Sequence, residues 1–505
     1  MTNEKEIIII ITVLLTIGIV SSLGILVGGI QASVMGALLV PCIVFSYSFP
    51  RWGILVFLIY LPLGGTISYG LVGVFQPFGA SVIYTVSYPL FHLAKEAFYL
   101  PALLRSLISY KFFLKSQLKF KPLLIVIALF GLSCLLTFCF VNFPQQLTSS
   151  PDKVLLMGII GLKNWLGYIP LIFCAYYLLN NKKNLIWLNR LFIIIIFIAC
   201  TLCFIQYLLL VYGICPGNSQ LPEPSNISAS LRAQCFVGGS VLYNPAKNLI
   251  RLPGTFVAPW QWAWFLISSS FLTYGIMLSE PSRLWKWISF CSLTTVLIAT
   301  LISGQRTALL LVPIVYLLLL LLTEQKNKNL AIKLGFISIL TIIITTQIGL
   351  VDERIANFIG RWEYSPPQRF IAQQIQWLTH DRITWLGHGL GKTASAARHL
   401  GSIQLVEVFP VKIVYEIGIL GFLGFFSLVT TLTILTFKAY GSLKTPGLRH
   451  LGLCLWLFIL LISYNPYYYP LTVDPVAVYY WFFAGILLKL PVLEQEKAFT
   501  PTQTK

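Results

Sequence analysis

Two arginines in this sequence stand where a cation is costly unless it meets an anion. Arg251 and Arg306 each lie directly beside a long apolar segment, and neither has an acidic residue close by in the sequence. An uncompensated charge at the edge of hydrocarbon is unfavourable. A guanidinium group presents a planar fork of N–H donors that matches phosphate oxygens, and it stays ionised at any relevant pH. We therefore expect Arg251 and Arg306 to bind an anionic group.

Further arginines cluster in two polar stretches between apolar segments. They are Arg232 in the first stretch and Arg354, Arg361, Arg369, Arg382 and Arg398 in the second. We include Arg361, Arg382 and Arg398 among the candidate anion-binding residues. The alternative is that the cluster forms ion pairs with the acidic residues of the second stretch, which are Asp352, Glu353, Glu363 and Asp381.

The elements that position these residues are predicted to be membrane-spanning helices. The chain has 505 residues, of which 57% are hydrophobic and only 10% charged, and its mean hydropathy is +0.82. A soluble core of this length cannot hide so much apolar surface. A helical span needs about 17 to 25 mostly apolar residues. The sequence therefore predicts an all-α polytopic membrane protein with about 14 transmembrane helices, in the range of about 12 to 14.

The candidate spans follow one another along the whole chain. They cover roughly residues 7–27, 34–49, 53–69, 88–108, 122–140, 154–178, 191–210, 260–277, 288–302, 308–322, 334–350, 410–437, 451–463 and 476–488. We expect the first span to be retained, because no small-residue cleavage site followed by a polar region comes after it. Since the sequence shows no internal repeat, residues 1–505 are predicted to form a single membrane domain.

The net charge of +19 is carried largely by short basic loops, which predict the orientation of the chain rather than a nucleic-acid partner. Counted along the predicted helices, five of these loops lie on one side of the membrane. They contain Lys111, Lys115, Lys119 and Lys121; Lys182, Lys183 and Arg190; Arg283 and Lys286; Lys326, Lys328 and Lys333; and Lys438, Lys444 and Arg449. The positive-inside rule makes that side cytoplasmic. Both termini are then cytoplasmic, and the two longest loops, over residues 211–259 and 351–409, face outward.

Two of the ten cysteines lie outside the predicted spans. Cys215 and Cys235 share the first long loop and would close a ring of about twenty residues. An outward-facing compartment permits disulfides. We expect the two cysteines to be joined.

Several motifs in the second half of the chain resemble the O-antigen ligase and O-antigen polymerase family. They are the segment RLPGTF from Arg251, followed by Pro259 and an apolar helix; SGQRTA from Ser303; GHGLG from Gly387; and YEIGILG from Tyr415. The resemblance covers residues 251–424, whereas the first half of the chain matches only in hydropathy. It implies the helical membrane fold of lipid-dependent glycosyltransferases.

The resemblance also implies an activity and a site. Family members transfer a glycan from an undecaprenyl diphosphate carrier to an acceptor hydroxyl at the outer face of the bacterial plasma membrane, without a metal or another cofactor. Arg251 and Arg306 would then hold the diphosphate leaving group. Where the ligases have a catalytic histidine, about eleven residues before Gly418, this sequence has Glu407. A carboxylate can serve as the general base, and His388 and His399 are the alternatives, so ligase and polymerase both stay open.

Charges and tryptophans within the predicted spans have two interpretations each. Lys163 is a candidate contact to the lipid diphosphate, or else pairs with another helix. Lys95 and Glu96 are adjacent, so we expect each to find its partner on another helix. Trp260, Trp262 and Trp264 are expected at the membrane interface or, alternatively, stacked on sugar rings; three neighbouring tyrosines, Tyr467, Tyr468 and Tyr469, have the same two interpretations.

Two other classes of function compete with a transferase. A transporter or a flippase of the lipid-linked saccharide would favour charged or broken helices at mid-membrane, often in two matched halves, and the sequence shows no such repeat. A non-catalytic scaffold for envelope assembly would need none of the arginines for chemistry. Neither class requires an arginine-rich outer loop of the length seen here.

Overall fold

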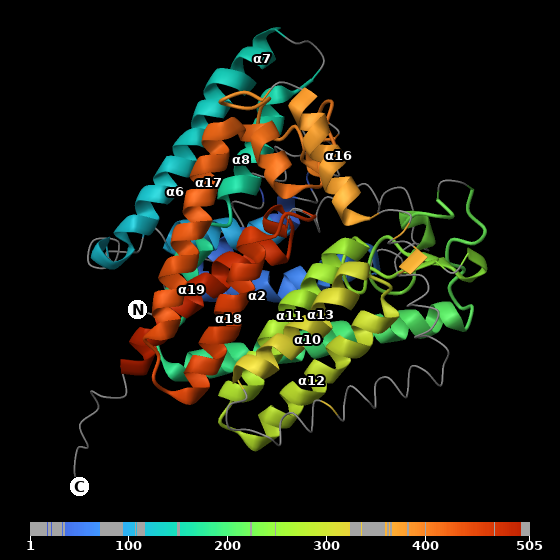
Figure 1. Cartoon of the computed structure of the whole chain (residues 1–505), viewed down its shortest axis with the longest axis vertical. Helices are drawn as coiled ribbons and strands as arrows, with labels where there is room; N and C mark the ends of the chain where they lie inside the picture. The colour runs from blue at the N-terminus through green and yellow to red at the C-terminus, as the bar shows by residue number, and fades with distance from the viewer. Residues whose placement is uncertain are drawn as a thin grey trace. The chain divides into compact units, whose positions relative to one another are not determined.

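The computed structural model is mostly helical. It describes residues 36–70, 94–106, 117–148, 152–222, 225–247, 249–323, 366–380, 383–398, 400–468 and 470–495, together with a few isolated positions. Figure 1 labels the elements. The chain divides into two compact units: unit 1 is Met1–Tyr110, Leu188–Thr273 and Trp287–Arg354, and unit 2 is Lys111–Trp187, Tyr274–Lys286 and Ile355–Lys505.

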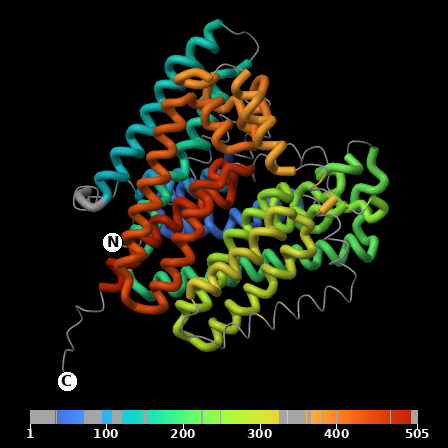
Figure 2. The backbone as a smooth tube through the Cα atoms, viewed as in Figure 1, coloured from blue at the N-terminus to red at the C-terminus, as the bar shows by residue number. Residues whose placement is uncertain are grey.

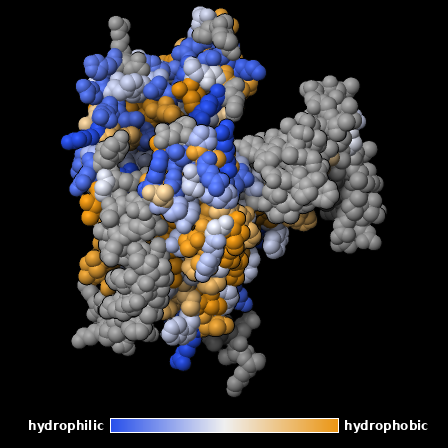
Figure 3. Space-filling model, turned by 90° about the vertical axis from the view of Figure 1, so that its right-hand side faces the viewer, coloured by the Kyte–Doolittle hydropathy of each residue, from blue (hydrophilic) through white to orange (hydrophobic). Residues whose placement is uncertain are grey.

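Nine helices in the described part of the chain are long and apolar enough to cross a membrane, and two shorter apolar helices precede them. The nine cover Phe120–Thr148, Val154–Tyr176, Lys182–Val211, Pro259–Ser279, Arg283–Ile302, Arg306–Thr323, Phe409–Gly441, Pro446–Tyr464 and Val476–Gln495. On the face drawn in Figure 3, hydrophilic and hydrophobic side chains gather in separate areas. The chain is thus a multi-pass helical membrane protein. The spans expected over residues 7–27 and 334–350 lie outside the described residues.

Unit 1 is built around one helix that is buried on nearly all sides. The unit contains α2 (Pro50–Tyr60), α13 (Arg306–Thr323) and the short strands β1 (Leu242–Asn244) and β2 (Leu249–Arg251), together with most of α10 (Lys182–Val211), of α11 (Pro259–Ser279) and of α12 (Arg283–Ile302). In α11, Trp262 and Trp264 are completely buried, and Trp262 stacks on Phe265. A helix that is apolar all round is a core helix. The expectation that these two tryptophans form an interfacial belt is therefore wrong.

Unit 2 pairs two long helices over much of their length. It contains α6 (Gln117–Thr137), α7 (Phe143–Thr148), α8 (Val154–Leu166), α9 (Leu171–Leu178), α16 (Pro367–His380), α17 (Phe409–Gly441), α18 (Pro446–Tyr464) and α19 (Val476–Gln495). The tube in Figure 2 shows α6 (cyan) running alongside α17 (orange), and α17 also packs on α18 and α19. A π-helical segment, Phe138–Asn142, joins α6 to α7. The polar run around Arg369 and Gln374 forms α16.

Lys95 and Glu96 contact each other. The Lys95 Nζ and Glu96 Oε1 atoms lie 4.0 Å apart. Side chains of this length reach across one residue even though the two do not share a helix face. This contact is additional to the partners expected on other helices, and that expectation stays a prediction.

Candidate functional site

Two motifs of unit 1 that are fifty residues apart in the sequence lie side by side. Strand β2 pairs antiparallel with β1, with Leu242 opposite Arg251. Just beyond the strand, Leu252 N donates to the Ser303 carbonyl at 3.0 Å. A Cβ added to Gly304 would lie 2.2 Å from the Ile250 carbonyl oxygen, so only glycine fits there. The backbone therefore brings the Arg251 segment against the turn that leads into Arg306.

Arg306 is the first residue of α13, and the Arg251 segment meets the helix at this end. The Gln305 carbonyl accepts the first helical bond, from Leu309 N at 2.9 Å. The N-terminus of a helix carries partial positive charge and unpaired N–H groups, so it favours anions. Both arginines are half-buried. The Gln305 side chain is 4% exposed, and its amide nitrogen has no hydrogen-bond partner among the described residues.

The residues after Arg251 are fixed in place by the core of unit 1. Gly254 has φ +56°, and a Cβ there would lie 2.4 Å from the Trp262 ring. The Thr255 hydroxyl donates to the Pro62 carbonyl, and the Thr255 carbonyl accepts from Thr66 N at 3.1 Å. The RLPGTF motif is therefore a closely packed segment of defined backbone conformation rather than a mobile loop.

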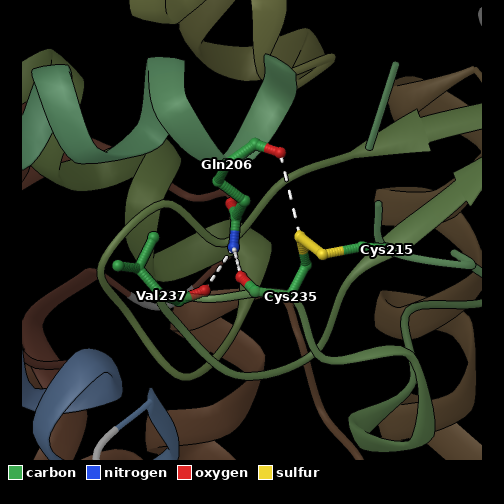
Figure 4. Close-up of a disulfide and its surroundings, with 4 residues drawn as sticks. All are labelled: Gln206, Cys215, Cys235 and Val237. Carbon is green, nitrogen blue, oxygen red and sulfur yellow. Dashed lines mark hydrogen bonds between the residues drawn. A yellow bond between two sulfur atoms is a disulfide. The ribbon is translucent and has the colours of Figure 1, made fainter. Parts of the chain in front are cut away.

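A disulfide closes a ring that precedes the hairpin in the sequence. Cys215 and Cys235 are joined, with their Cα atoms 5.6 Å apart, as the sequence predicted. Figure 4 shows the bond beside Gln206 of α10, whose amide nitrogen donates to the carbonyls of Cys235, at 3.1 Å, and of Val237. The Cys235 sulfur lies 3.9 Å from the Gln206 carbonyl. This is a contact only, because a disulfide sulfur has no proton to donate.

In unit 2, the glycine-rich turn is joined to a break in α17. Gly418 has φ 74° and ψ −167°, which interrupts the helix. The N–H groups of Ile419 and Leu420 donate to the carbonyls of Thr384 and Trp385, both at 3.2 Å. In the other direction, the carbonyls of Tyr415 and Glu416 accept from His388 N at 2.7 Å and Gly389 N at 3.2 Å. We call this set of four bonds the splice.

The splice leaves no room for side chains at its glycines. A Cβ at Gly418 would lie 2.3 Å from the Trp385 carbonyl oxygen, and one at Gly387 would lie 2.5 Å from the Glu416 carbonyl. Further along the turn, Leu390 N donates to Asn142 Oδ1 at 2.9 Å and Thr393 N to Glu416 Oε1 at 2.8 Å. Since these amides are bound to protein acceptors, the turn is not a backbone cradle for phosphate.

Two buried charges on α17 hold the end of this turn. Glu416 is 1% exposed; its carboxylate accepts from Trp165 Nε1 at 2.7 Å and from both the amide and the hydroxyl of Thr393. Lys412, one helical turn earlier, is 6% exposed and donates to the Thr393 carbonyl at 3.1 Å. Neither residue is among the candidates predicted from the sequence. Two charges spaced i, i+4 within an otherwise apolar span were the available signal.

The candidate proton acceptors of unit 2 differ in their surroundings. His388 stacks on Tyr415 with 4.6 Å between ring centroids, and its Nε2 atom is buried without a hydrogen-bond partner among the described residues. Glu407 is half-buried, and its backbone N–H donates to Gln374 Oε1 at 3.0 Å. His399 lies outside the described residues. His388 thus offers an uncommitted ring nitrogen on a fixed backbone.

Of the remaining candidate residues, the structure describes Lys163 and Arg398. Lys163 lies 5.4 Å from the centre of the Tyr168 ring, a cation–π geometry. Arg398 is exposed at the end of the turn. Arg361 and Arg382 lie outside the described residues. Among the residues that the structure describes, no three His, Cys, Asp or Glu side chains form a group that could hold a metal ion.

No protein-family model matches the chain, and no curated protein matches its sequence.

Proposed function

We propose that the chain is a lipid-linked glycan transferase of the O-antigen ligase or polymerase type, acting at the outer face of a bacterial plasma membrane. The observation that carries this proposal is the backbone contact between Leu252 and Ser303, because it makes neighbours of the segments that hold Arg251 and Arg306. A helix N-terminus at the same place adds a third source of positive potential. Such a site suits the diphosphate of undecaprenyl-diphosphate-linked saccharide.

In this reaction the acceptor hydroxyl attacks the anomeric carbon of the donor. The new glycosidic bond forms as the bond from that carbon to the phosphate oxygen breaks, and the diphosphate leaves with the electron pair. Negative charge on the diphosphate therefore grows in the transition state, where Arg251 and Arg306 stabilise it. The acceptor proton passes to a base, for which Glu407 and His388 are the candidates in the described part of the chain.

The test is transfer activity of the purified full chain with undecaprenyl-diphosphate-linked oligosaccharide and saccharide or lipid acceptors. Arg251→Ala and Arg306→Ala should each lower turnover by about a hundredfold, with a smaller effect on donor binding. Lysine at either position should restore activity only partly, because it supplies the charge without the fork. Arg283→Ala is the control, since Arg283 is an exposed arginine at the start of α12.

The base is tested by Glu407→Gln and His388→Asn in the same assay. A general base acts only after it has lost its proton, so activity should fall as the pH drops through the pKa of the base. The variant that abolishes this fall in the pH–rate profile identifies the base. Wild-type activity in both arginine variants would contradict the proposal. Movement of labelled donor across the bilayer without product formation would instead support a flippase.

A further inference from the structure

The exposed residues of α17 begin only after its break. From Phe409 to Gly418 no side chain of the helix is exposed. Beyond it, large apolar side chains are exposed at intervals of three or more residues, and these are Leu420, Leu423, Phe426, Ile434 and Phe437. Positions spaced in this way lie on one face of a helix. In a membrane-spanning helix, such an exposed apolar face meets the hydrocarbon of the bilayer.

The length of this face matches the thickness of the hydrocarbon. Leu420 and Phe437 are 17 residues apart, which is about 26 Å along a helix, and the hydrocarbon of a bilayer is about 30 Å thick. Lys438 follows directly and is exposed, as expected where a helix leaves the hydrocarbon. The complete helix, Phe409–Gly441, would be about 50 Å long if it were straight. The part of α17 before Gly418 is therefore not needed to cross the hydrocarbon layer.

A tryptophan marks the other end of the apolar face. Trp385 is 66% exposed, and its carbonyl accepts from Leu420 N at 3.2 Å, so it lies beside the first residue of the face. An indole ring prefers the boundary between hydrocarbon and headgroups, since it combines an apolar body with a polar N–H. Ile383, two residues earlier, is 46% exposed.

Helix α6 contacts the chain beside Trp385 at its end. Its exposed apolar residues are Ile125, Leu129, Leu132 and Leu135. Shortly after them, the Thr137 hydroxyl donates to the Leu386 carbonyl at 2.9 Å, next to Trp385. From Lys121, which is exposed, to Thr137 the helix extends about 24 Å. Phe140 and Phe143, which follow α6, are also exposed, so the exposed apolar side chains continue past Thr137 here and the position of the boundary rests on α17 and Trp385.

Helix α16 has the side-chain arrangement of a helix that lies along such a boundary. Arg369, Gln373, Gln376 and His380 form a polar row. Ile371, Ile375 and Leu378 form an apolar row; Leu378 is buried against Val406, Val408 and Val411, whereas Ile375 is 49% exposed. The exposed apolar flank continues along the chain into Ile383 and Trp385.

We propose that α16 and the segment from Ile383 to Trp385 rest on the bilayer surface, and that the hydrocarbon boundary crosses α17 at Gly418. The partner is the lipid bilayer itself. Lys412 and Glu416 then lie on the headgroup side of the boundary, inside protein, rather than in the middle of the membrane. The placement does not depend on the proposed transferase activity.

The experiment measures the depth of nitroxide labels in vesicles of phosphatidylethanolamine and phosphatidylglycerol by their relative exposure to oxygen and to a water-soluble nickel complex. Cys42, Cys139 and Cys291 are first replaced by serine, because the other free cysteines in the described residues are buried. Labels are then placed by Leu420→Cys, Trp385→Cys and Gln376→Cys. The label at position 420 should be exposed mainly to oxygen, and the label at position 376 mainly to the nickel complex. The label at position 385 should be exposed to both to a similar extent.

Leu147 provides the matched control. It is apolar and 75% exposed, like Trp385, but it follows Thr137 by ten residues in the direction of α7. A label at 147 should be exposed to nickel. A label at 147 within the hydrocarbon, or a label at 385 as exposed to nickel as the one at 376, would overturn the proposal. If Trp385→Cys does not fold, Ile383→Cys gives the same measurement.

Discussion

The arginine segment of unit 1 and the glycine-rich turn of unit 2 are held in place by opposite means. The arginine segment packs against the core of unit 1 and follows a ring, residues 215–235, that a disulfide closes; its charges, Arg251 and Arg306, are half-buried. The turn is held by main-chain bonds to a broken helix, and its charges, Lys412 and Glu416, are buried. A region with a disulfide beside it and a region held by main-chain bonds to a broken helix should fail under different substitutions.

The largest effect is expected from Gly418→Ala. The left-handed φ of 74° is strained for alanine, and the new Cβ would meet the Trp385 carbonyl oxygen at 2.3 Å. The free energy of unfolding should fall by at least about 3 kcal/mol. Thermal unfolding in detergent would show this as a much lower midpoint temperature. Gly441→Ala in the same helix is the control, because nothing lies within 4 Å of a Cβ there. Equal midpoints for the two variants would refute the account of the splice.

Removing the disulfide should affect the other region alone. The double substitution Cys215→Ser with Cys235→Ser opens a ring with a sequence separation of 20, which should cost about 3 kcal/mol of stability in the chain-entropy account. Limited proteolysis should then cleave within residues 212–258, while the turn of unit 2 stays protected. Cys139→Ser, at an exposed free cysteine, should change neither result. If residues 212–258 and the turn of unit 2 became equally sensitive to the protease, the disulfide would not act on the first region alone, and the comparison would be contradicted.

A smaller loss is expected from Glu416→Gln. The amide keeps one oxygen for Thr393, but its NH₂ group would face another donor, Trp165 Nε1, where the carboxylate accepts a hydrogen bond. An unsatisfied buried donor costs about 1 to 3 kcal/mol, to be measured as a lowered unfolding midpoint. Glu363→Gln, at an exposed carboxylate, should be neutral. No difference between these variants would mean that Glu416 does not hold the turn.

The smallest effect is expected from lowering the pH, which protonates the Asp152 carboxylate. The amide and hydroxyl of Ser402 donate to Asp152 Oδ2, at 3.1 and 2.9 Å, and these bonds lower the pKa of the Asp152 carboxyl below its ordinary value of 3.8. A pKa that is lower in the folded state stabilises the fold above about pH 3.8, and this contribution is lost as the pH falls through the folded value. The protection of the Ser402 amide against hydrogen exchange, measured relative to its intrinsic rate at each pH, should fall below pH 3.8. Asp152→Asn should remove that dependence; its persistence would assign it to another group.

Nine of the predicted spans coincide with helices of membrane length in the described part of the chain, because a run of apolar residues long enough to cross a bilayer has few other uses. The span expected over 260–277 is α11, Pro259–Ser279, and the one over 410–437 lies within α17. The disulfide was predictable because Cys215 and Cys235 were the cysteines left outside the predicted spans. Hydropathy could not distinguish the buried Trp262 from an interfacial tryptophan, since both lie at a helix end.

The contacts that form the candidate sites could not be predicted. Glu416 is bound by Trp165, which is 251 residues away, and no spacing rule links the two. Strands β1 and β2 have three residues each, which is too short for an alternating pattern to show. The break at Gly418 depends on carbonyl groups of Thr384 and Trp385, so it is a property of tertiary structure rather than of the helix sequence.

The splice also implies an order of assembly. The segment from Thr384 to Gly389, which completes the hydrogen bonding of α17, is synthesised about thirty residues before the break at Gly418. Asn142 and Trp165, which hold the turn and Glu416, come earlier still. When the ribosome adds the last residue of α17, the chain already contains every partner of this joint. The joint at Gly418 therefore needs no residue of α18 or α19, whereas the start of α17 does depend on later residues, because Phe409 N donates to the Pro466 carbonyl.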